Sequence, residues 1–285
     1  MTISTTLTII GSLNVDLTCR VHRLPSPGET TGGGSLTRQP GGKGGNQAAA
    51  AARLAGAARM VGAVGRDSDG RLLTEALELV GVDVSAVKQV SEPTGTALIV
   101  IDSDGENQIA VASGANAFVS LDRAGLSDGG PVLAQLEIAV ETVTEAARRT
   151  TGFFALNAAP ARELPAELLE RCDLVIVNES EYQLIPELRN AKRVAVTYGS
   201  GGASMYAHGV RTAHAPAQKA RVVNSVGAGD SFCAALVLAL ASGLDEESSL
   251  AAACAVGAAA VASELSQPEF ARLEHYLDGR ALQGA

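Results

Sequence analysis

Leu174-Val175-Ile176-Val177 is a run of four apolar residues, three of which are β-branched. A strand with apolar side chains on both faces fits a parallel sheet that helices cover on both sides. Outward from this run, short β-like segments alternate with helical patterns in both directions along the chain. This alternation predicts a three-layer α/β/α sandwich with a doubly wound sheet.

The expected strands are short runs of apolar and β-branched residues, at positions 6–10, 58–61, 96–101, 108–111, 132–135, 152–156, 174–177, 193–197 and 204–207. The expected helices have apolar residues at helical spacing, at positions 45–54, 71–80, 140–149, 166–171, 231–241, 248–263 and 268–277.

Two segments interrupt this rhythm, residues 17–40 and 94–112, because both contain β-type residues without a helical pattern. The second has two strand-like halves joined by Asp102-Ser103-Asp104-Gly105, a sequence suited to a hairpin turn. We expect the two segments to pair into a small sheet that covers a site; a surface meander without a role is the alternative. The predicted division is therefore an α/β core of residues 1–16, 41–93 and 113–285, with residues 17–40 and 94–112 forming a β lid.

The chain has 285 residues, of which 46% are hydrophobic and 19% are charged, so a large core can form. Its net charge of −9 argues against nucleic acids and membranes as partners, since nucleic acids and anionic membranes are bound by basic surfaces. Aromatic residues make up 3% of the chain and Trp is absent, which argues against a base-stacking platform.

The four cysteines, Cys19, Cys172, Cys233 and Cys254, lie far apart and form no CxxC pair. This spacing predicts reduced thiols rather than a zinc site or a disulfide framework. The N-terminal residues lack the features of a signal peptide, and the longest apolar run, at 234–241, is about half the length that spans a bilayer. We therefore expect a soluble cytoplasmic protein.

Asn224-Ser225-Val226-Gly227-Ala228-Gly229-Asp230-Ser231-Phe232 precedes an apolar helical run and carries the strongest local signal for chemistry. Gly227, Ala228 and Gly229 let the backbone approach a ligand closely, and the free amides of the following helix would point at an anion. Asp230 could take a proton from an attacking hydroxyl, as a base does in phosphoryl transfer. An ordinary helix cap is the alternative.

Gly41-Gly42-Lys43-Gly44-Gly45-Asn46-Gln47 leads into an alanine-rich helix. The segment is not a P-loop, because the required spacing of glycine, lysine and hydroxyl residues is absent. The backbone of Gly42 and the side chains of Lys43 and Asn46 offer donors to a polyhydroxylated ligand. A tight helix start would explain the glycines but not Lys43 and Asn46 together.

Polar residues follow the expected strands at their carboxyl ends, where open α/β sheets bind ligands. Asn14 and Asp16 follow the first strand and could hold vicinal hydroxyls, and Glu137 follows the strand at 132–135. An Asx-type turn is the alternative for the first pair.

Two further clusters follow strands. Asn178 and Glu181 stand three residues apart and could hold the water shell of Mg²⁺, or could form a capping box. Thr197-Tyr198-Gly199-Ser200-Gly201-Gly202 could receive a nucleotide, or could form a glycine-rich hairpin turn.

Together these motifs resemble the ribokinase-type (PfkB) carbohydrate kinase family, and within it the chain looks closest to the ribokinases. The two glycine-rich segments resemble the two family signatures. Segments 62–70, 114–117, 157–160 and 178–181 also match family stretches and follow in the expected order. The resemblance covers about the whole chain.

The resemblance implies a ribokinase-like sandwich with a small β-sheet lid, ATP and Mg²⁺ as cofactors, and often a homodimer formed through the lid. It implies that Asp230 is the base and that the amides of Gly227, Ala228 and Gly229 form an anion hole. It assigns the sugar to Asn14, Asp16, Gly42, Lys43, Asn46 and Glu137. It assigns the nucleotide to Asn178, Thr197, Gly199 and Gly202, and Mg²⁺, through water, to Asn178 and Glu181.

The chain departs from the family pattern where relatives bind an activating monovalent cation, a site to which Asn224 and Val226 would correspond. The family usually has Asp-Thr where this chain has Asn224-Ser225, so one negative charge is missing. The loop at 264–268, which would supply carbonyl ligands, looks shortened. Both departures predict that K⁺ activates weakly or not at all.

The function implied is transfer of the γ-phosphoryl group of ATP to a primary hydroxyl of a small sugar, with D-ribose preferred and D-ribose 5-phosphate as product. Within the same fold, the alternative is a kinase of nucleosides or of another sugar or sugar acid. An alternative from another class is a sugar- or nucleotide-binding sensor without turnover, against which the retention of Asp230 argues.

Overall fold

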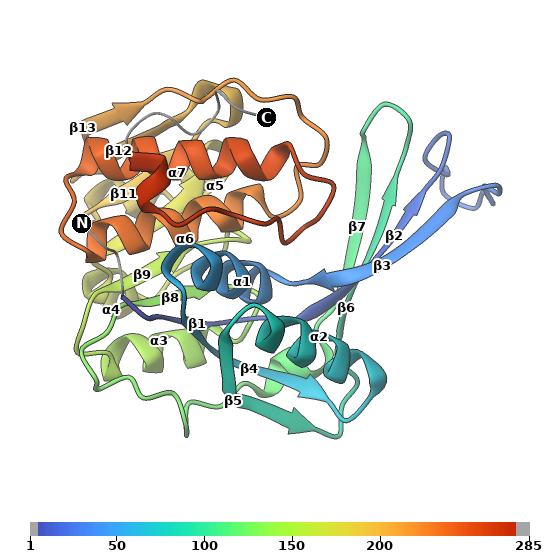
Figure 1. Ribbon diagram of the computed structural model, residues 1–285, viewed down its shortest axis with the longest axis horizontal. Coiled ribbons are helices and arrows are strands. Elements are labelled where there is room, and N and C mark those ends of the chain that lie inside the picture. Colours follow the sequence, from blue (N-terminus) through green and yellow to red (C-terminus); the bar gives the residue numbers. More distant parts are fainter. Residues whose placement is uncertain (1–4, 278–285) are drawn as a thin grey trace.

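A nine-stranded sheet forms the centre of the protein in the computed structural model, which describes residues 5–277 (Figure 1). Its strands lie in the order β13-β12-β11-β10-β9-β8-β1-β4-β5, and all neighbours pair in parallel except that β12 is antiparallel to β11 and β13. The strands are β1 Leu7–Ile10, β4 Ala58–Gly65, β5 Val82–Val90, β8 Val132–Gln135, β9 Phe154–Asn157, β10 Leu174–Asn178, β11 Val194–Thr197, β12 Ala203–Ala207 and β13 Val210–Ala215.

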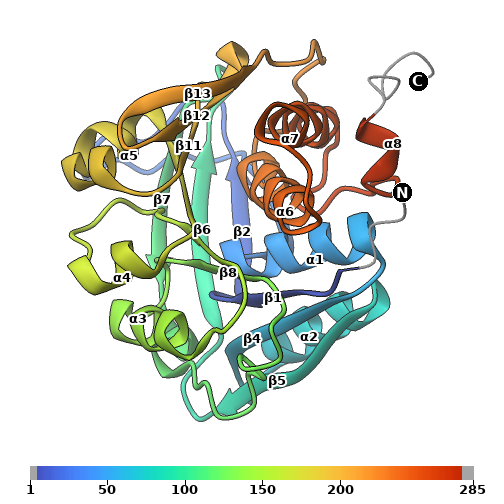
Figure 2. The same ribbon diagram turned by 90° about the vertical axis from the view of Figure 1, so that its left-hand side faces the viewer.

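Helices cover both faces of this sheet, as Figure 2 shows. One face carries α1 Lys43–Ala55, α2 Ser68–Leu79, α6 Ala228–Ala241, α7 Glu246–Val261 and α8 Glu274–Leu277. The other face carries α3 Val140–Arg149, α4 Ala166–Arg171 and α5 Glu179–Leu184. Short 3₁₀ turns are η1 Gly114–Phe118, η2 Pro186–Asn190 and η3 Gly199–Gly201.

Strand β10 confirms the reasoning that predicted a buried parallel sheet. Leu174 and Ile176 pack in the apolar cluster beneath α1, α6 and α7, whereas Val175 and Val177 pack in the cluster beneath α3, α4 and α5. Successive side chains of a strand point to opposite faces, so a strand covered on both sides must be apolar throughout. The three-layer α/β/α sandwich is therefore confirmed.

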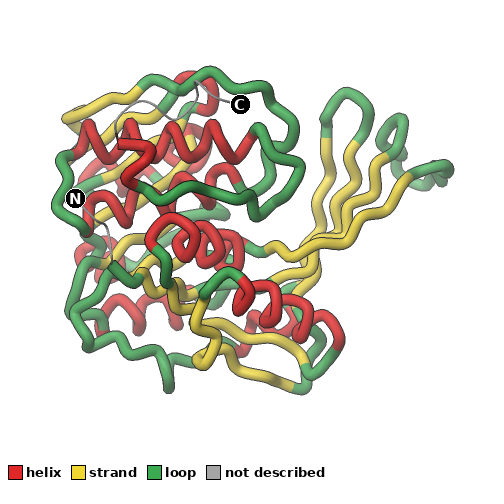
Figure 3. Tube along the Cα trace, viewed as in Figure 1, coloured by secondary structure: helices red, strands yellow, loops and turns green. Residues whose placement is uncertain are grey.

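A second sheet of four strands projects from the body of the molecule (Figure 3). Its order is β3-β2-β6-β7, formed by β2 Asn14–Arg20, β3 Ser35–Gly41, β6 Gly95–Ile101 and β7 Asn107–Ala112. Strand β2 pairs in parallel with β6, so the two segments that interrupt the helical rhythm meet as expected and form the lid. The division of the chain into core and lid domains at 16/17, 40/41, 93/94 and 112/113 stays a prediction.

Some sequence-based boundaries were wrong. The helix expected at 268–277 is helical only at Glu274–Leu277, and Leu273 instead donates its backbone N–H to the carbonyl of Leu54. Strands β5 and β13 were not expected, although the apolar residues of β5 alternate with polar ones, as an edge strand requires. None of the helices in the described part of the chain is long and apolar enough to cross a membrane.

Candidate active site

The predicted site residues gather at the carboxyl ends of β1 and β8, which lie side by side in the centre of the sheet. The chain order of the strands reverses here, because β4 lies on one side of β1 and β8 on the other. Such a switch point leaves a crevice between the loops that leave the two strands. The start of α1, the start of α6 and the first residues of lid strand β2 all meet at this crevice.

Asp230 lies in the first turn of α6 and is buried. Its Oδ1 accepts a hydrogen bond of 3.1 Å from Nε2 of Gln47, and its Oδ2 accepts one of 3.1 Å from Nδ2 of Asn46. Burial raises the pKa of Asp230; the Lys43 ammonium and the hydrogen bond from Asn46 oppose this shift, and the net change is upward. A buried carboxylate with a raised pKa and fixed geometry can act as a general base.

The backbone just before Asp230 is shaped for a ligand. Gly227 is the N-cap of α6 with φ 80°, a conformation that favours glycine, and a side chain there would collide with the carbonyl of Ser266. The space beside Gly229 is open: apart from its own helical turn and chain neighbours, no described atom lies within 4 Å of where its Cβ would stand. The first N–H groups of a helix have no helical partners, so amides at this helix start can bind an anion, although the N–H of Ala228 already donates a long hydrogen bond of 3.4 Å to the carbonyl of Ser225.

Lys43 and Glu137 face one another across the crevice. Lys43 is half-buried, and although burial alone would lower its pKa, the charges of Asp230 and Glu137 raise it. Oε2 of Glu137 accepts hydrogen bonds from Oγ of Ser12 at 2.5 Å and from the backbone N–H of Lys43 at 3.2 Å. These bonds fix one carboxylate oxygen of Glu137 and leave the other for a ligand hydroxyl.

Asp16 and Asn14 reach the same site from the lid. Burial, together with the negative charges of Glu137 and Asp230, raises the pKa of Asp16 to about 7. Oδ1 of Asn14 accepts a 2.7 Å hydrogen bond from Nδ2 of Asn116, a residue of η1 that also bonds the backbone of Leu13. Three carboxylates and one ammonium therefore converge beneath the lid, and a polyhydroxylated ligand has both acceptors and a donor to bind.

Asn178 and Glu181 form the capping box that the sequence left open as an alternative. Oδ1 of Asn178 accepts from the backbone N–H of Glu181, and Oε2 of Glu181 accepts from the backbone N–H of Asn178, both at 2.8 Å. The charge of Glu181 also contributes, as the smallest cause, to the raised pKa of Lys43. Within residues 5–277, no group of three or more His, Cys, Asp or Glu side chains is arranged to hold a metal ion.

A second cavity, of about 510 Å³, lies between η3, α6 and α7. It is lined by Thr197, Gly199, Gly202, Ala228 and Gly229, so the start of α6 borders this cavity as well as the crevice. Asn178 does not line this cavity but pairs with Thr197 across β10 and β11. Residues that sequence reasoning missed also line it: Gln218, Lys219, Val222, Phe232, Cys254 and Val261. The first three lie at 216–222, a segment without a motif; Phe232 ends the singled-out segment 224–232, and the last two lie on α7 outside any motif.

The loop before α6 is held by the side chain of Asn224. Its Nδ2 donates to the carbonyl of Glu264 at 3.0 Å, and its Oδ1 accepts from the backbone N–H of Val226 at 3.0 Å. The amide therefore ties residues 224–226 to the segment after α7 by direct hydrogen bonds. An acid at position 224 would lack the donor that bonds Glu264.

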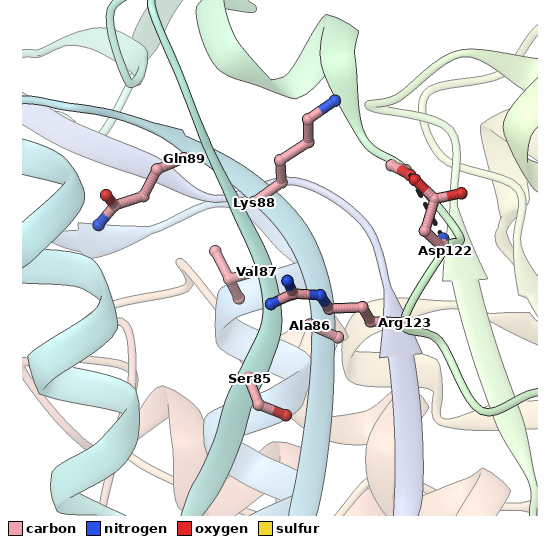
Figure 4. Close-up of a pocket in the computed structure, with 8 residues that line it drawn as sticks. Ser85, Ala86, Val87, Lys88, Gln89, Asp122 and Arg123 are labelled. Carbon is pink, nitrogen blue, oxygen red and sulfur yellow. Dashed lines mark hydrogen bonds between the residues drawn. The ribbon is translucent and has the colours of Figure 1, made fainter.

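Five buried polar residues around the site were not predicted as functional: Ser12, Gln47 and Asn116 bond predicted site residues, and Gln135 and Asn157 bond Gln47 in turn. Gln47, Asn116 and Asn157 lie inside segments singled out by sequence, so their position could have suggested them; Ser12 and Gln135 needed the tertiary structure. A further hollow of about 400 Å³ lies far from these residues on edge strand β5, where Lys88 and Arg123 project from its rim (Figure 4).

Comparison with protein families matches residues 4–270 to the model described as pfkB family carbohydrate kinase. The chain is 36% identical to the ribokinase of Bacillus subtilis (strain 168) over 261 residues, which cover 85% of this chain and 88% of that protein. It is 32% identical to the ribokinase of Arabidopsis thaliana over 288 residues, covering 90% of this chain and 76% of that protein.

Solved structures give the same result. The ribokinase of Thermotoga maritima superposes with a TM-score of 0.86 at 29% identity, covering 97% of this chain and 99% of that one. The ribokinase of Arabidopsis thaliana, solved in complex with ribose and ATP, gives a TM-score of 0.85 at 30% identity, covering 96% and 98%. The nucleoside kinase of Methanocaldococcus jannaschii gives 0.84 at 20% identity and coverage of 97% and 98%, which is a likeness of fold alone.

Proposed function

The chain belongs to the pfkB family of carbohydrate kinases and is an ATP-dependent kinase, and we propose that its acceptor is D-ribose, phosphorylated at the primary 5-hydroxyl. The observation that carries the proposal is the convergence of Asp16, Lys43, Glu137 and Asp230 in one crevice at the start of α6. Relatives at 32–36% identity are ribokinases, and one neighbour was solved with ribose and ATP.

Asp230 is the proposed base. The 5-hydroxyl oxygen of the sugar attacks the γ-phosphorus of ATP, the O–H proton passes to a carboxylate oxygen of Asp230, and the bond to the β-phosphate oxygen breaks to release ADP. The amides of residues 227–229 stabilise the charge on the transferred phosphoryl group, because that charge is spread over its oxygens in the transition state. The raised pKa of Asp230 suits a group that must gain a proton near neutral pH.

The proposed sugar clamp combines lid and core. Asn14 and Asp16 extend from β2, while Gly42, Lys43, Asn46 and Glu137 belong to the core. Ribose presents vicinal hydroxyls, which suit carboxylate acceptors and an ammonium donor at fixed spacing. The nucleotide occupies the 510 Å³ cavity beside Thr197, Gly199 and Gly202, with its phosphates at the start of α6.

Mg²⁺ fits the amide and carboxylate oxygens of Asn178 and Glu181, because this ion keeps several waters and takes few protein ligands. Each side chain retains lone pairs beyond those of the capping box. When bound, the ion would neutralise charge on the phosphates of ATP. K⁺ is not part of the proposed mechanism, because the amide of Asn224 already ties the loop through Glu264 and Val226.

We propose that two copies of the chain associate through their lids in the cytoplasm, where the four free thiols would stay reduced. The small sheet exposes large apolar side chains that a second copy could cover: Leu36, Leu98, Ile109 and Val111. Sedimentation of Leu98→Asp and Ile109→Asp, one change for each face of the sheet, tests this. A monomeric wild type, or dimers in both variants, would argue against the lid as the interface.

The substrate is tested by ADP release with a panel of pentoses, hexoses, sugar acids and nucleosides, each with and without K⁺. The proposal expects the highest kcat/KM for D-ribose and D-ribose 5-phosphate as product. A nucleoside or sugar acid as the best acceptor would replace ribose while keeping the kinase. Tight sugar binding without ADP release would indicate a sensor.

A further inference from the structure

We propose that Gln47 is a positioning residue for the base, held in one orientation by a chain of buried amides that ends on a backbone carbonyl. The proposal rests on the proposed role of Asp230. Gln47 lies in the first part of α1 and is 0% exposed, as is Gln135 at the end of β8. Asn157, at the end of β9, is 7% exposed. Gln135 and Asn157 therefore lie at the carboxyl ends of neighbouring central strands, and Gln47 meets them from helix α1.

The donor and acceptor roles along this series of hydrogen-bonded amides are fixed by its last acceptor, a backbone carbonyl of the sheet. The carbonyl of Ile176 in β10 can only accept a hydrogen bond, so the group of Asn157 that faces it at 3.2 Å must be Nδ2. Oδ1 of Asn157 then faces Gln47, and only a donor can occupy the 3.1 Å position opposite, which makes that atom Nε2 of Gln47. The orientation of each amide thus follows from the one below it.

The two N–H bonds of the Gln47 amide serve two acceptors. One donates to Oδ1 of Asn157 and the other to Oδ1 of Asp230, each at 3.1 Å. Oε1 of Gln47 accepts a 2.6 Å hydrogen bond from Nε2 of Gln135, which prevents the amide from rotating. Gly11 leaves the space for Gln135, since a side chain at position 11 would overlap its amide.

This arrangement gives Gln47 a role beyond filling the core. Because Gln47 can present only a donor to Oδ1 of Asp230, it favours the ionised carboxylate and fixes the plane of that group. Asn46 holds Oδ2 from the neighbouring position on α1. A base must be ionised before it can take the proton, and small errors in its position are costly in rate.

Other charged or titratable groups also face Asp230. They are Lys43, Glu137, Cys233 and, from the lid, Asp16. All four are unchanged when Gln47 is replaced, so a shift in the titration of Asp230 would report the lost amide. Turnover at saturating sugar and ATP removes the contribution of Asp16 to sugar binding.

The test compares Gln47→Leu, Gln135→Leu and Gln47→Glu with wild type in pH profiles of kcat. In Gln47→Leu we expect the acidic limb to move up by about one pH unit, so that kcat at pH values on that limb falls roughly tenfold, because one hydrogen bond to the ionised base is lost. Gln135→Leu should also move the acidic limb to higher pH, but by less than Gln47→Leu does. Gln47→Glu should move it further than Gln47→Leu, since a second carboxylate then faces Asp230. KM for ATP should stay within about twofold in all three.

A control separates positioning from loss of stability. Leu77→Ala removes a buried side chain from α2, away from the site, and provides a variant of lowered thermal midpoint. Its kcat, corrected for the folded fraction, should equal wild type, and its acidic limb should not move. If Gln47→Leu behaves like Leu77→Ala, the role of Gln47 is structural and the proposal is overturned.

The failure of this proposal can be told apart from failure of the proposed base. Asp230→Asn is measured in parallel. Loss of turnover in Asp230→Asn with an unmoved acidic limb in Gln47→Leu would overturn the positioning role only. Near-normal kcat in Asp230→Asn would overturn the base, and the positioning role with it.

Discussion

Gly41 makes room for the carboxylate of Asp16: a Cβ atom at position 41 would overlap the Oδ1 and Oδ2 atoms of that side chain. Strands β2 and β3 run antiparallel where the lid joins the core, and Gly41 is the last residue of β3. The glycine therefore allows a charged side chain to turn into the site at the base of the lid. The closeness of these two residues yields a test of the sugar clamp.

Gly41→Ala should raise KM for the sugar at least tenfold, because the added methyl group displaces the carboxylate of Asp16. KM for ATP should change by less than about twofold, since the cavity proposed for the nucleotide is lined by residues of η3, α6 and α7 and not by Asp16. Gly45→Ala is the matched control, as its Cβ would meet its nearest atom, Cδ2 of Leu13, at 3.2 Å. Steady-state kinetics of both variants decide the matter; equal effects on sugar KM would argue against the placement of Asp16.

Sugar binding should weaken as the pH falls through about 7. In the proposed clamp Asp16 accepts hydrogen bonds from two hydroxyls, which the ionised carboxylate does best, and its pKa is raised to about 7 by burial and by the charges of Glu137 and Asp230. KM for the sugar should therefore rise by up to about tenfold per pH unit below 7. Asp16→Ala should have a high KM for the sugar, with little dependence on pH. A flat profile in wild type would contradict the assignment.

Asp16 should also lower the stability of the free protein at neutral pH. The unfolded carboxyl ionises near its ordinary pKa of 3.8, whereas the folded one ionises near 7, so unfolding releases protons between these values and stability falls as the pH rises through this window. Asp16→Asn should therefore raise the thermal midpoint at pH 8 and change it little at pH 4. Calorimetry of the sugar-free protein at both pH values measures this. Equal midpoint changes at the two pH values would mean that ionisation of Asp16 is not the cause.

Asp230→Asn should fold and bind ATP but lose turnover by roughly 10²–10⁴-fold, because an amide cannot accept the hydroxyl proton. The size and shape of the side chain are preserved, so the hydrogen bond from Asn46 to Oδ2 can remain. Single-turnover assays, with enzyme in excess over ATP and with saturating sugar, measure the chemical step directly. A near-normal rate would reduce Asp230 to a residue that stabilises the start of α6.

K⁺ should stimulate the enzyme by less than about twofold. A monovalent ion near the start of α6 needs negative charge nearby, and Asn224 supplies a neutral amide that already bonds Glu264 and Val226. Initial rates against KCl, with choline chloride holding ionic strength constant, test this, and Asn224→Asp reports whether an added carboxylate creates a response. A large, saturable activation of wild type would contradict the prediction.

Much of the fold was predictable because its signals are local. The all-apolar run at 174–177 required burial on both faces, and α3 and α4 have the bounds expected from their periodicity. The start of α8 was missed because Leu273 bonds the carbonyl of Leu54, a contact between distant segments. Edge strand β5 was missed because its polar residues weaken the apolar signal, although they suit an exposed edge.

The sequence by itself determined which residue types could do the chemistry. Asp230 follows one glycine-rich loop, Lys43 and Asn46 lie in a second glycine-rich loop, and Asp16 follows the first strand. Only the tertiary structure decided what surrounds them. Asp230 gains its raised pKa from burial, and its two oxygens gain their donors from Asn46 and Gln47 on another helix. The physical reason is that pKa values, amide orientations and cavities depend on groups brought together by folding from distant positions in the chain, whereas spacing in a sequence records only neighbours.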